Sequence, residues 1–202
     1  MKRLLDIAVS LAGLIVLAIP FAIIALLIRL DSPGPVFYRQ DRVGQRGKVF
    51  RIWKFRTMVH GAERMGLGSN VHACDERITR VGRVLRCWGL DELPQLINVL
   101  RGEMSLVGPR PSLPSHVPLY TAEERRRLDV KPGITGWAQI HGRNSISWEE
   151  RIRYDIWYVD HRSIWLDLYI LYRTIPVCLR REGIYGPGGI NDPFLARRST
   201  PG

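Results

Sequence analysis

The sequence predicts a single small α+β domain, rich in helix and with one short β-hairpin, on an N-terminal re-entrant membrane helix and interfacial amphipathic helices. Three observations predict this fold. The chain has 202 residues, the length of one domain or two small ones. An uncharged apolar run occupies residues 7–28, and residues 31–182 contain no repeat, low-complexity segment or Ser-rich linker. We therefore divide the chain into a membrane segment (1–30), a globular domain (31–182) and a loop-like C-terminal tail (183–202).

The charge of the chain points to partners that carry phosphate. Lys and Arg number 30 and Asp and Glu number 19, a formal net charge of +11. Hydrophobic residues make up 46% of the chain, which excludes a disordered basic tail. Three cysteines are too few and too scattered for a disulfide-stabilised fold. The expected partner classes are nucleic acid, anionic lipid and nucleotide-like substrates.

The apolar run is long enough to enter a membrane. Its 22 residues would extend about 33 Å as a straight helix, close to the hydrocarbon thickness of a bilayer. A cleaved signal peptide is disfavoured, because the run closes on Arg29 and not on a small-residue cleavage site.

The course of this segment follows from Pro20 and from the basic flanks. Pro20 removes a backbone hydrogen bond and predicts a kink or break. Lys2 and Arg3 precede the run, and a basic stretch at 39–56 follows it. Because basic flanks stay on the cytoplasmic side, we favour a re-entrant hairpin, with a straight crossing as the alternative.

Local patterns predict the first elements of the globular domain. The DSPGP turn at 31–35 ends the membrane segment. Residues 36–40 and 48–55 are rich in β-formers and are separated by glycines, which predicts a hairpin. Apolar residues at helical spacing predict helices over 75–88 and 90–100.

Two capping boxes and one long apolar pattern predict the remaining helices. Thr121-x-x-Glu124 and Ser147-x-x-Glu150 each match a capping box that opens a helix. Residues 163–181 form a long helix in which Trp and Tyr alternate with aliphatic residues. Such a helix suits the membrane interface, and a buried core position explains the pattern about as well.

The strongest candidate for chemistry is the pair Asp91 and Glu92 in the segment LDELPQ. Pro94 belongs in a first helical turn, so the two acids are expected at a helix N-terminus, where the dipole lowers their pKa and keeps them ionised. An ionised carboxylate can serve as a nucleophile or as a metal ligand. Acids in this position most often only cap the helix. The residues around the pair therefore decide between a catalytic role and a helix cap.

Basic and polar residues suited to phosphate surround this pair in the sequence. Arg110 lies between two prolines, which fix its backbone and aim its guanidinium, although a stiff surface turn has the same pattern. A Gly-rich segment at 131–144 has exposed amides and polar side chains that suit a nucleotide or sugar pocket. The full set of candidate phosphate or substrate ligands is Lys54, Arg56, Arg86, Arg110, Gln139, Arg143 and Asn144.

Two other site types are weighed against this one. His72, Cys74 and Cys87 offer three metal ligands without a Cys-x-x-Cys pair, so we expect no metal centre there. Basic residues with interleaved aromatics suit nucleic acid, but no helix-turn-helix, RRM or zinc-finger spacing is present.

Several motifs in one order resemble the bacterial sugar transferases, in particular the small monotopic phosphoglycosyl transferases. After an N-terminal KR…D and a Pro-broken apolar run come GxVFYxQxRxG, KFRTM, RITRxGxxLR, LDELPQLxNVL, GxMSLVGPRP, PGITGWAQ and GRNxIxWE. Together they cover residues 2 to about 182. Two positions depart from the family pattern, because Ile19 and Gly89 stand where the family often has serine.

The resemblance implies transfer of a phosphosugar from a UDP-sugar to a polyprenol phosphate, typically undecaprenyl phosphate, with Mg²⁺ as cofactor and UMP as product. It implies that Asp91 attacks the sugar-bearing phosphorus and carries the phosphosugar, so that the reaction is ping-pong. Glu92 then helps Asp91 to hold Mg²⁺ or shapes the pair, and Arg86 and Arg110 bind phosphate. The enzyme would lie in the bacterial inner membrane, in contact with membrane lipids, with its active site on the cytoplasmic face and no nucleic acid partner.

Two other functions stay open at this point. One is a non-catalytic basic protein of the membrane surface, in which Asp91 and Glu92 only cap a helix. The other is a membrane-attached nucleic-acid-binding protein, which would bind with strong salt dependence. The sequence leaves open the donor sugar, the biosynthetic pathway, and whether the protein is a monomer or a homodimer.

Overall fold

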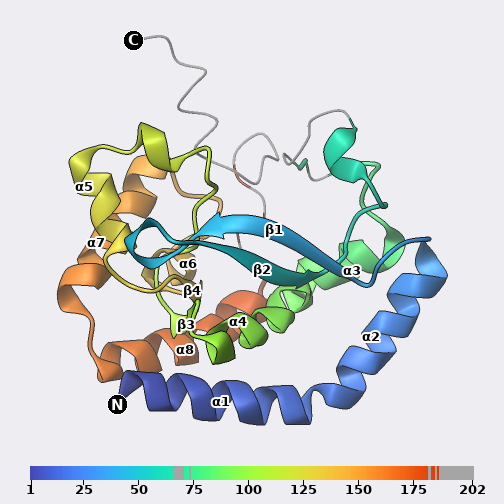
Figure 1. Cartoon of the computed structure of the whole chain (residues 1–202), viewed down its shortest axis with the longest axis horizontal. Coiled ribbons are helices and arrows are strands. Elements are labelled where there is room, and N and C mark those ends of the chain that lie inside the picture. The colour runs from blue at the N-terminus through green and yellow to red at the C-terminus, as the bar shows by residue number, and fades with distance from the viewer. Residues whose placement is uncertain (66–70, 73, 182, 185, 187–202) are drawn as a thin grey trace.

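The computed structural model describes residues 1–65, 71–72, 74–181, 183–184 and 186, and it has the predicted α+β architecture (Figure 1). The helices are α1 (Lys2–Val16), α2 (Ala18–Asp31), α3 (Arg80–Trp88), α4 (Leu96–Arg101), α5 (Ala122–Arg125), α6 (Trp137–Ile140), α7 (Trp148–His161) and α8 (Ile164–Leu179). The 3-10 helices are η1 (Gln45–Gly47), η2 (Ala62–Arg64), η3 (Leu90–Gln95), η4 (Val117–Leu119) and η5 (Arg126–Leu128). The strands are β1 (Phe37–Val43), β2 (Val49–Phe55), β3 (Ser105–Val107) and β4 (Gly133–Thr135). Most of the predicted tail, residues 187–202, lies outside the described residues.

The predicted hairpin is confirmed. β1 and β2 pair antiparallel, from Phe37 opposite Phe55 to Val43 opposite Val49. Because side chains alternate between the two faces of a strand, Ile52 enters the main core from the same face that carries Lys54. The same face of the hairpin therefore contributes apolar side chains to the core and carries polar side chains such as Lys54.

A second strand pair, β3 and β4, has no counterpart among the elements predicted from the sequence. The two strands are parallel, with Ser105 opposite Gly133 and Val107 opposite Thr135. Strands of three residues are too short to show an alternating pattern. A Cβ on Gly133 would lie 2.1 Å from the backbone nitrogen of Gly108, so the close approach of the two segments requires glycine.

The helix predicted over 75–88 begins later than expected. The Asp75 carboxylate accepts hydrogen bonds from the backbone nitrogen and the guanidinium of Arg77, which stabilises a turn at this point. Local side-chain bonds of this kind compete with helix formation. Thr79 then caps α3, since its hydroxyl accepts from the backbone nitrogen of Gly82.

The other helix predictions hold in place and differ in detail. The helix predicted over 90–100 is split into η3, which contains Pro94, and α4. Both capping boxes are present, at Thr121 and at Ser147. α8 occupies the last predicted helix and has a buried side and an exposed side, so its place in a membrane interface stays a prediction. One side buries Ile170 in the core, and the other exposes aromatic side chains such as Trp165 and Tyr172.

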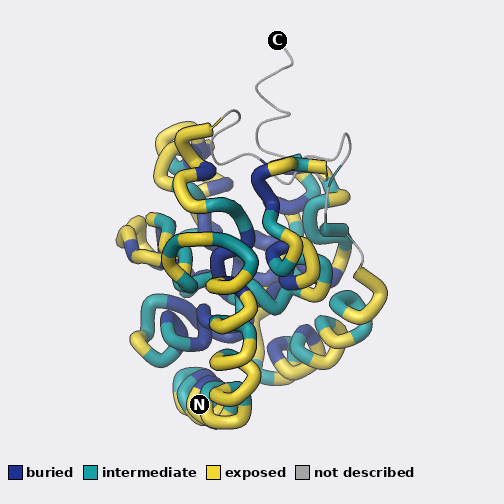
Figure 2. Tube along the Cα trace, turned by 90° about the vertical axis from the view of Figure 1, so that its right-hand side faces the viewer, coloured by how far each residue is buried: buried dark blue, intermediate teal, exposed yellow. Residues whose placement is uncertain are grey.

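The two N-terminal helices form a bent pair (Figure 1). α1 and α2 together have the length and composition of a membrane span, and the chain bends by 60° between them. No single helix among the described residues is long and apolar enough to span a membrane by itself. The break lies at Leu17, before Pro20, because proline at position 20 cannot donate to the carbonyl of Val16. Exposed residues recur along the outer side of both helices (Figure 2).

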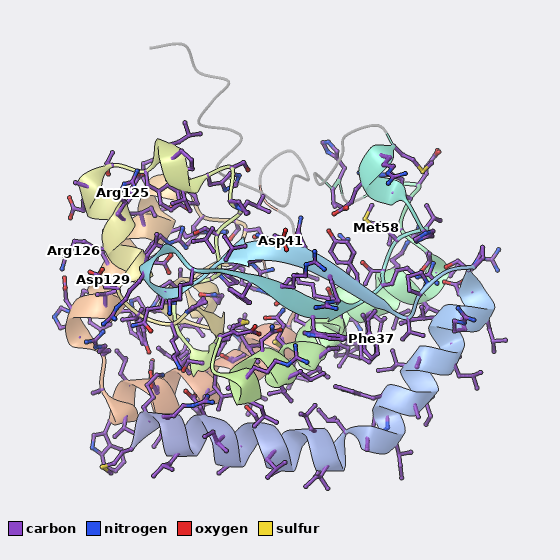
Figure 3. The ribbon with its side chains drawn as sticks, in the orientation of Figure 1. Phe37, Asp41, Met58, Arg125, Arg126 and Asp129 are labelled. Atoms are coloured by element: carbon purple, nitrogen blue, oxygen red, sulfur yellow. The ribbon has the colours of Figure 1, made fainter. Side chains whose placement is uncertain are left out.

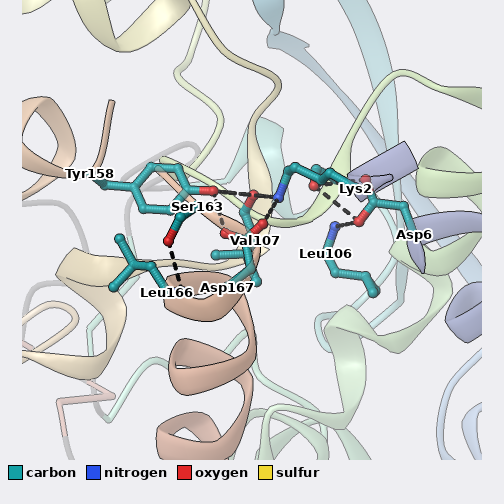
Figure 4. A network of polar contacts seen from close by, with 9 residues as sticks. Lys2, Asp6, Leu106, Val107, Tyr158, Ser163, Leu166 and Asp167 are labelled. Carbon is teal, nitrogen blue, oxygen red and sulfur yellow. Dashed lines mark hydrogen bonds and ion pairs between the residues drawn. The ribbon is translucent and has the colours of Figure 1, made fainter. Parts of the chain in front are cut away.

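The start of α1 is bound to the globular domain (Figure 4). Lys2 Nζ donates to the carbonyl of Val107 at 3.1 Å and to Asp167 Oδ2 at 2.5 Å. Asp6, which is 3% exposed, accepts hydrogen bonds from Ser105 Oγ and from the backbone nitrogen of Leu106.

The end of α2 is bound to the same domain. Asp31 Oδ2 accepts from the backbone nitrogen of Val81 at 2.9 Å. The Arg56 guanidinium donates to the carbonyls of Pro33 and Ser32, both at 2.8 Å. Both ends of the bent helix pair are therefore attached to one domain.

Candidate active site

The predicted acids lie on η3 at the edge of a cavity. Gly89 has φ +68°, a left-handed conformation that ends α3 and turns the chain into η3. Pro94 and Gln95 are buried, whereas Asp91 and Glu92 are partly exposed. The cavity, here called the acid-pair cavity, has a volume of about 620 Å³ and is bounded by the hairpin and residues 57–64.

Eight of the nine predicted site residues line this cavity. They are Lys54, Arg56, Arg86, Asp91, Glu92, Arg110, Arg143 and Asn144. The ninth, Gln139, lies in an adjoining chamber of about 30 Å³ that shares Arg110, Arg143 and Asn144 with the cavity. Phe37, at the start of β1, and Met58, in the chain after β2, also line the cavity (Figure 3).

Glu92 is held by two cations. Arg110 donates to both of its oxygens, Nη1 to Oε2 at 3.0 Å and Nη2 to Oε1 at 2.5 Å, in a bidentate pair. Lys54 Nζ donates to Oε1 at 2.7 Å. Burial alone would raise the pKa of Glu92, but Arg110 and Lys54 hold this pKa well below its usual value. Glu92 is therefore ionised and engaged within the protein.

Asp91 is in a different electrostatic state. Burial and the neighbouring Glu92 carboxylate raise the pKa of Asp91, against the opposing charges of Lys54, Arg86 and Arg110. The prediction that both pKa values are lowered is thus wrong for Asp91, because burial and the Glu92 charge raise its pKa more than the nearby cations lower it. Within the described residues, the Asp91 side chain makes no hydrogen bond or ion pair. It is the carboxylate available to a substrate.

The cations around the acid pair are set in place by other elements. Arg86 Nε donates to Thr57 Oγ1 at 2.8 Å, which fixes its guanidinium beside η3. Burial lowers the pKa of Lys54, and the Glu92 carboxylate opposes this effect. Positive groups held at fixed positions around one unpaired carboxylate form a site suited to a polyanionic substrate.

The backbone of Arg110 is held in place by a buried ion pair between Arg127 and Asp155. Arg127 Nη2 donates to the carbonyl of Arg110 at 3.1 Å and to Asp155 Oδ2 at 2.6 Å. The Arg127 and Asp155 side chains are only 3% and 2% exposed. The prolines on either side of Arg110 restrict the backbone, and this ion pair fixes where it lies.

Two predicted ligands, Arg56 and Gln139, are placed less directly at the acid pair. Arg56 borders the cavity, but its guanidinium binds the carbonyls after α2, so its contact with substrate stays a prediction. Gln139 is 9% exposed, and neither atom of its amide has a hydrogen-bond partner within the described part of the chain.

Sequence reasoning missed residues that line the cavity from the hairpin and from the chain after α8. Tyr38, Gln40 and Arg42 lie on β1, on the face that carries Lys54 on β2. The period-two alternation of a hairpin that contains Lys54 could have identified them. Ile184 also lines the cavity, and no local pattern marks it.

The acid pair has carboxylate oxygens, the donor type that Mg²⁺ prefers, and those of Glu92 also accept from Arg110 and Lys54. Mg²⁺ in phosphoryl-transfer sites is typically held by one or two carboxylates together with substrate phosphates, not by a closed protein cage. Asp91 and Glu92 are two adjacent carboxylates facing a cavity. Among the described residues, no group of three or more His, Cys, Asp or Glu side chains could hold a metal by itself.

Comparison with known proteins gives one family. The family model described as bacterial sugar transferase matches residues 1–181. The chain is 47% identical over 184 residues to the uncharacterized sugar transferase EpsL of Bacillus subtilis, covering 91% of this chain and 90% of the relative. It is 44% identical over 193 residues to the UDP-glucose:undecaprenyl-phosphate glucose-1-phosphate transferase of Caulobacter vibrioides, covering 91% and 72%. It is 40% identical over 199 residues to the undecaprenyl-phosphate galactose phosphotransferase of Salmonella typhimurium, covering 92% and 42%.

Proposed function

The chain belongs to the bacterial sugar transferase family, and from this membership and the acid-pair cavity we propose that it transfers a phosphosugar from a UDP-sugar to a polyprenol phosphate. The names of its relatives in Caulobacter vibrioides and Salmonella typhimurium, which give undecaprenyl phosphate as acceptor, support this reaction. Those names give glucose in one case and galactose in the other, so the donor sugar is left open. The observation that carries the proposal is an unpaired Asp91 carboxylate among fixed cations in a cavity.

Asp91 is the proposed nucleophile. One of its oxygens attacks the phosphorus that bears the sugar, and the bond from that phosphorus to the bridging oxygen of the diphosphate breaks. UMP leaves with the bridging oxygen and its electron pair, and the phosphosugar stays on Asp91 as an acyl phosphate. An oxygen of the polyprenol phosphate then attacks the same phosphorus, which regenerates the Asp91 carboxylate and forms the polyprenyl diphosphate sugar.

Glu92 and the cations prepare the cavity for this chemistry. The bidentate pair with Arg110 and the bond from Lys54 keep Glu92 charged and fix its position beside Asp91. Arg86 and Arg110 neutralise phosphate charge as the UMP group departs. The residues that would hold Mg²⁺ are Asp91 and Glu92, and the bound ion supplies Lewis-acid neutralisation of the diphosphate.

The attachment of both ends of the bent helix pair supports a re-entrant position in the membrane. Lys2 and Asp6 bind the domain at the start of α1, and Asp31 binds it at the end of α2. A segment whose two ends contact one domain leaves both ends on one side of the bilayer. Since both flanks are basic, we place that side at the cytoplasmic face of the inner membrane, where a soluble UDP-sugar and a lipid acceptor meet.

The reaction is tested on purified protein in detergent with undecaprenyl phosphate, Mg²⁺ and a panel of UDP-sugars, with UMP release as the measurement. We expect release with at least one donor, and loss of release in the Asp91→Asn variant. Asp41→Asn is the matched control, because Asp41 is an acid of β1 whose side chain is 55% exposed (Figure 3). Absence of UMP release with every donor contradicts the proposed function.

The nucleophile is tested separately from turnover. Incubation with labelled donor and no acceptor should leave one phosphosugar per protein, located at residue 91 by peptide mass spectrometry. An active wild type that forms no such adduct excludes the covalent route and leaves direct transfer. Salt-sensitive binding of nucleic acid by an inactive wild type would instead favour the nucleic-acid-binding alternative.

A further inference from the structure

The chain that follows α8 returns to the acid-pair cavity. The carbonyl of Gly183 accepts a hydrogen bond from the backbone nitrogen of Asn144 at 3.1 Å. The carbonyl of Ile184 accepts from Asn144 Nδ2 at 2.7 Å, and Ile184 itself lines the cavity. Residues 183–184 thus bind the 142–144 loop through two hydrogen bonds from one residue.

This loop carries Arg143 in a backbone conformation that needs support. Arg143 has φ +54°, in the left-handed region that non-glycine residues rarely adopt. Its carbonyl accepts a hydrogen bond from Arg151 Nη2, which also donates to Asn144 Oδ1. The strained residue is therefore held from the Arg151 side and from the side of residues 183–184.

The guanidinium of Arg143 lies next to the turn that leads into the acid pair. Arg143 Nη2 is 3.9 Å from the position that a Cβ on Gly89 would occupy. Gly89 precedes Asp91 by two residues, and Gly89, Asp91 and Arg143 all line the acid-pair cavity. The Arg143 guanidinium therefore borders the cavity that Asp91 lines, at the turn that leads to Asp91.

Gly183 leaves no room for a side chain. It has φ +61°, and a Cβ there would lie 2.2 Å from the carbonyl oxygen of Gly142 and 3.0 Å from Arg143 Cβ. Gly47 in the hairpin turn has a similar conformation, φ +76°, but no atom within 4 Å of its Cβ position. Both glycines have a left-handed backbone conformation. Only at Gly183 would a Cβ also overlap neighbouring atoms.

A third contact joins the same segment to the site. The Arg181 guanidinium lies 4.1 Å from the ring centroid of Trp88, the last residue of α3. This cation–π contact fixes the chain just before residues 183–184 against the helix that leads to Gly89.

We propose that residues 183–184 are a positioning element of the active site, which holds Arg143 for the diphosphate of the donor. This inference rests on the proposed function. The family match ends at residue 181, so the positioning element lies just beyond the matched part of the chain.

Gly183→Ala tests the proposal in the full-length protein, with Gly47→Ala as the matched control. Misplacement of a substrate-binding group by about 1 Å lowers activity by roughly 100-fold, so we expect Gly183→Ala to reduce kcat/KM for UMP release by about 10- to 100-fold. Gly47→Ala should stay within about 2-fold of the wild type, since surface substitutions away from a site have small effects. Equal activity of the two variants would overturn the proposal.

A double-mutant cycle with Arg143→Ala separates positioning from general damage to the fold. If Gly183 acts through Arg143, the double variant should be as impaired as Arg143→Ala alone. If the reduction in kcat/KM of the double variant equals the product of the two single reductions, Gly183 acts independently of Arg143 and the proposal is wrong. Should Gly183→Ala fail to fold, Arg181→Gln provides the second arm of the cycle, because it removes the Trp88 contact without crowding Gly142.

The cycle also distinguishes this proposal from the function on which it rests. An active wild type with an unaffected Gly183→Ala variant overturns the positioning element alone. A wild type that releases no UMP from any donor overturns the proposed function and the positioning element together.

Discussion

The opposite electrostatic states of Asp91 and Glu92 predict opposite effects on stability. Burial and Glu92 raise the pKa of Asp91, which means that the folded protein disfavours its charge. Arg110 and Lys54 lower the pKa of Glu92 against the effect of burial, which means that the folded protein favours its charge. We therefore expect Asp91→Asn to stabilise the protein and Glu92→Gln to destabilise it, although both should lower activity.

The size of the Glu92→Gln effect follows from exposure. Breaking a buried ion pair costs about 3–5 kcal/mol and breaking an exposed one costs below about 1 kcal/mol. The Glu92 and Lys54 side chains are each 15% exposed and that of Arg110 is 36% exposed, so the site lies between these limits. We expect a loss of about 2–3 kcal/mol, which corresponds to a fall in Tm of roughly 4–12 °C for a chain of this size.

The Asp91→Asn effect should be smaller and of opposite sign. Relief of a destabilised functional position typically adds about 0.5–2 kcal/mol, a rise in Tm of roughly 1–8 °C. Below the usual pKa of aspartate, about 3.9, Asp91 is protonated in both the folded and the unfolded wild type. The difference in stability between the wild type and Asp91→Asn should therefore vanish there. It should grow as the pH rises through the raised pKa of folded Asp91. The Glu92 contribution behaves in the opposite sense and is lost only as the pH falls through its lowered pKa.

Thermal unfolding of the purified variants in one detergent, at one scan rate and at several pH values, measures both effects. Asp41→Asn serves again as the control and should leave Tm nearly unchanged. A fall in Tm for Asp91→Asn as large as that for Glu92→Gln would refute the reasoning. It would mean that Asp91, like Glu92, is stabilised by its cations.

Arg86, Gly133 and Lys2 are the positions of three further predictions. Because Asp91 must be ionised to attack, the acidic limb of kcat/KM against pH should lie above the usual aspartate pKa, and Arg86→Ala should move it to higher pH. Gly133→Ala should lower the free energy of unfolding by about 1–3 kcal/mol, measured by thermal unfolding, because its Cβ would overlap a backbone nitrogen at 2.1 Å. Lys2→Met should cost about 1–3 kcal/mol, because it leaves the carboxylate of Asp167, 4% exposed, without its cation. The second change Asp167→Asn should restore part of that loss.

Each of these predictions has an opposing result. An unshifted acidic limb in Arg86→Ala would show that Arg86 does not act on the attacking carboxylate. A Gly133→Ala variant as stable as the wild type would show that the strands separate without cost. A double variant less stable than Lys2→Met would show that Asp167 is favoured as a charge even without Lys2.

Local patterns were sufficient for the hairpin, for most of the helices and for the location of the acid pair. Two segments rich in β-formers and separated by glycines identified the hairpin that carries Lys54, and two capping boxes identified the starts of α5 and α7. Pro20 indicated the bend between α1 and α2, and Pro94 indicated the helix start at the acid pair. These features depend on residues close together in the chain, so the sequence displays them directly.

The tertiary structure decided the chemical state of the site. Glu92 is paired with Lys54 from β2 and with Arg110 from the loop after β3, and these contacts span 38 and 18 residues of sequence. Arg56 was expected at the substrate, and the structure shows its bonds to the carbonyls after α2. β3 and β4 escaped prediction because each has three residues and its partner is far along the chain.

The sequence by itself determined the β1–β2 hairpin and the approximate location of most helices, which segment is apolar enough for a membrane, and which acids stand at a helix start. Only the tertiary structure decided that Asp91 is unpaired with a raised pKa while Glu92 is paired with a lowered one, and that Gly183 contacts the loop carrying Arg143. The physical reason is that desolvation and charge pairing depend on distances through space. Those distances are set when segments far apart in the chain pack around one cavity.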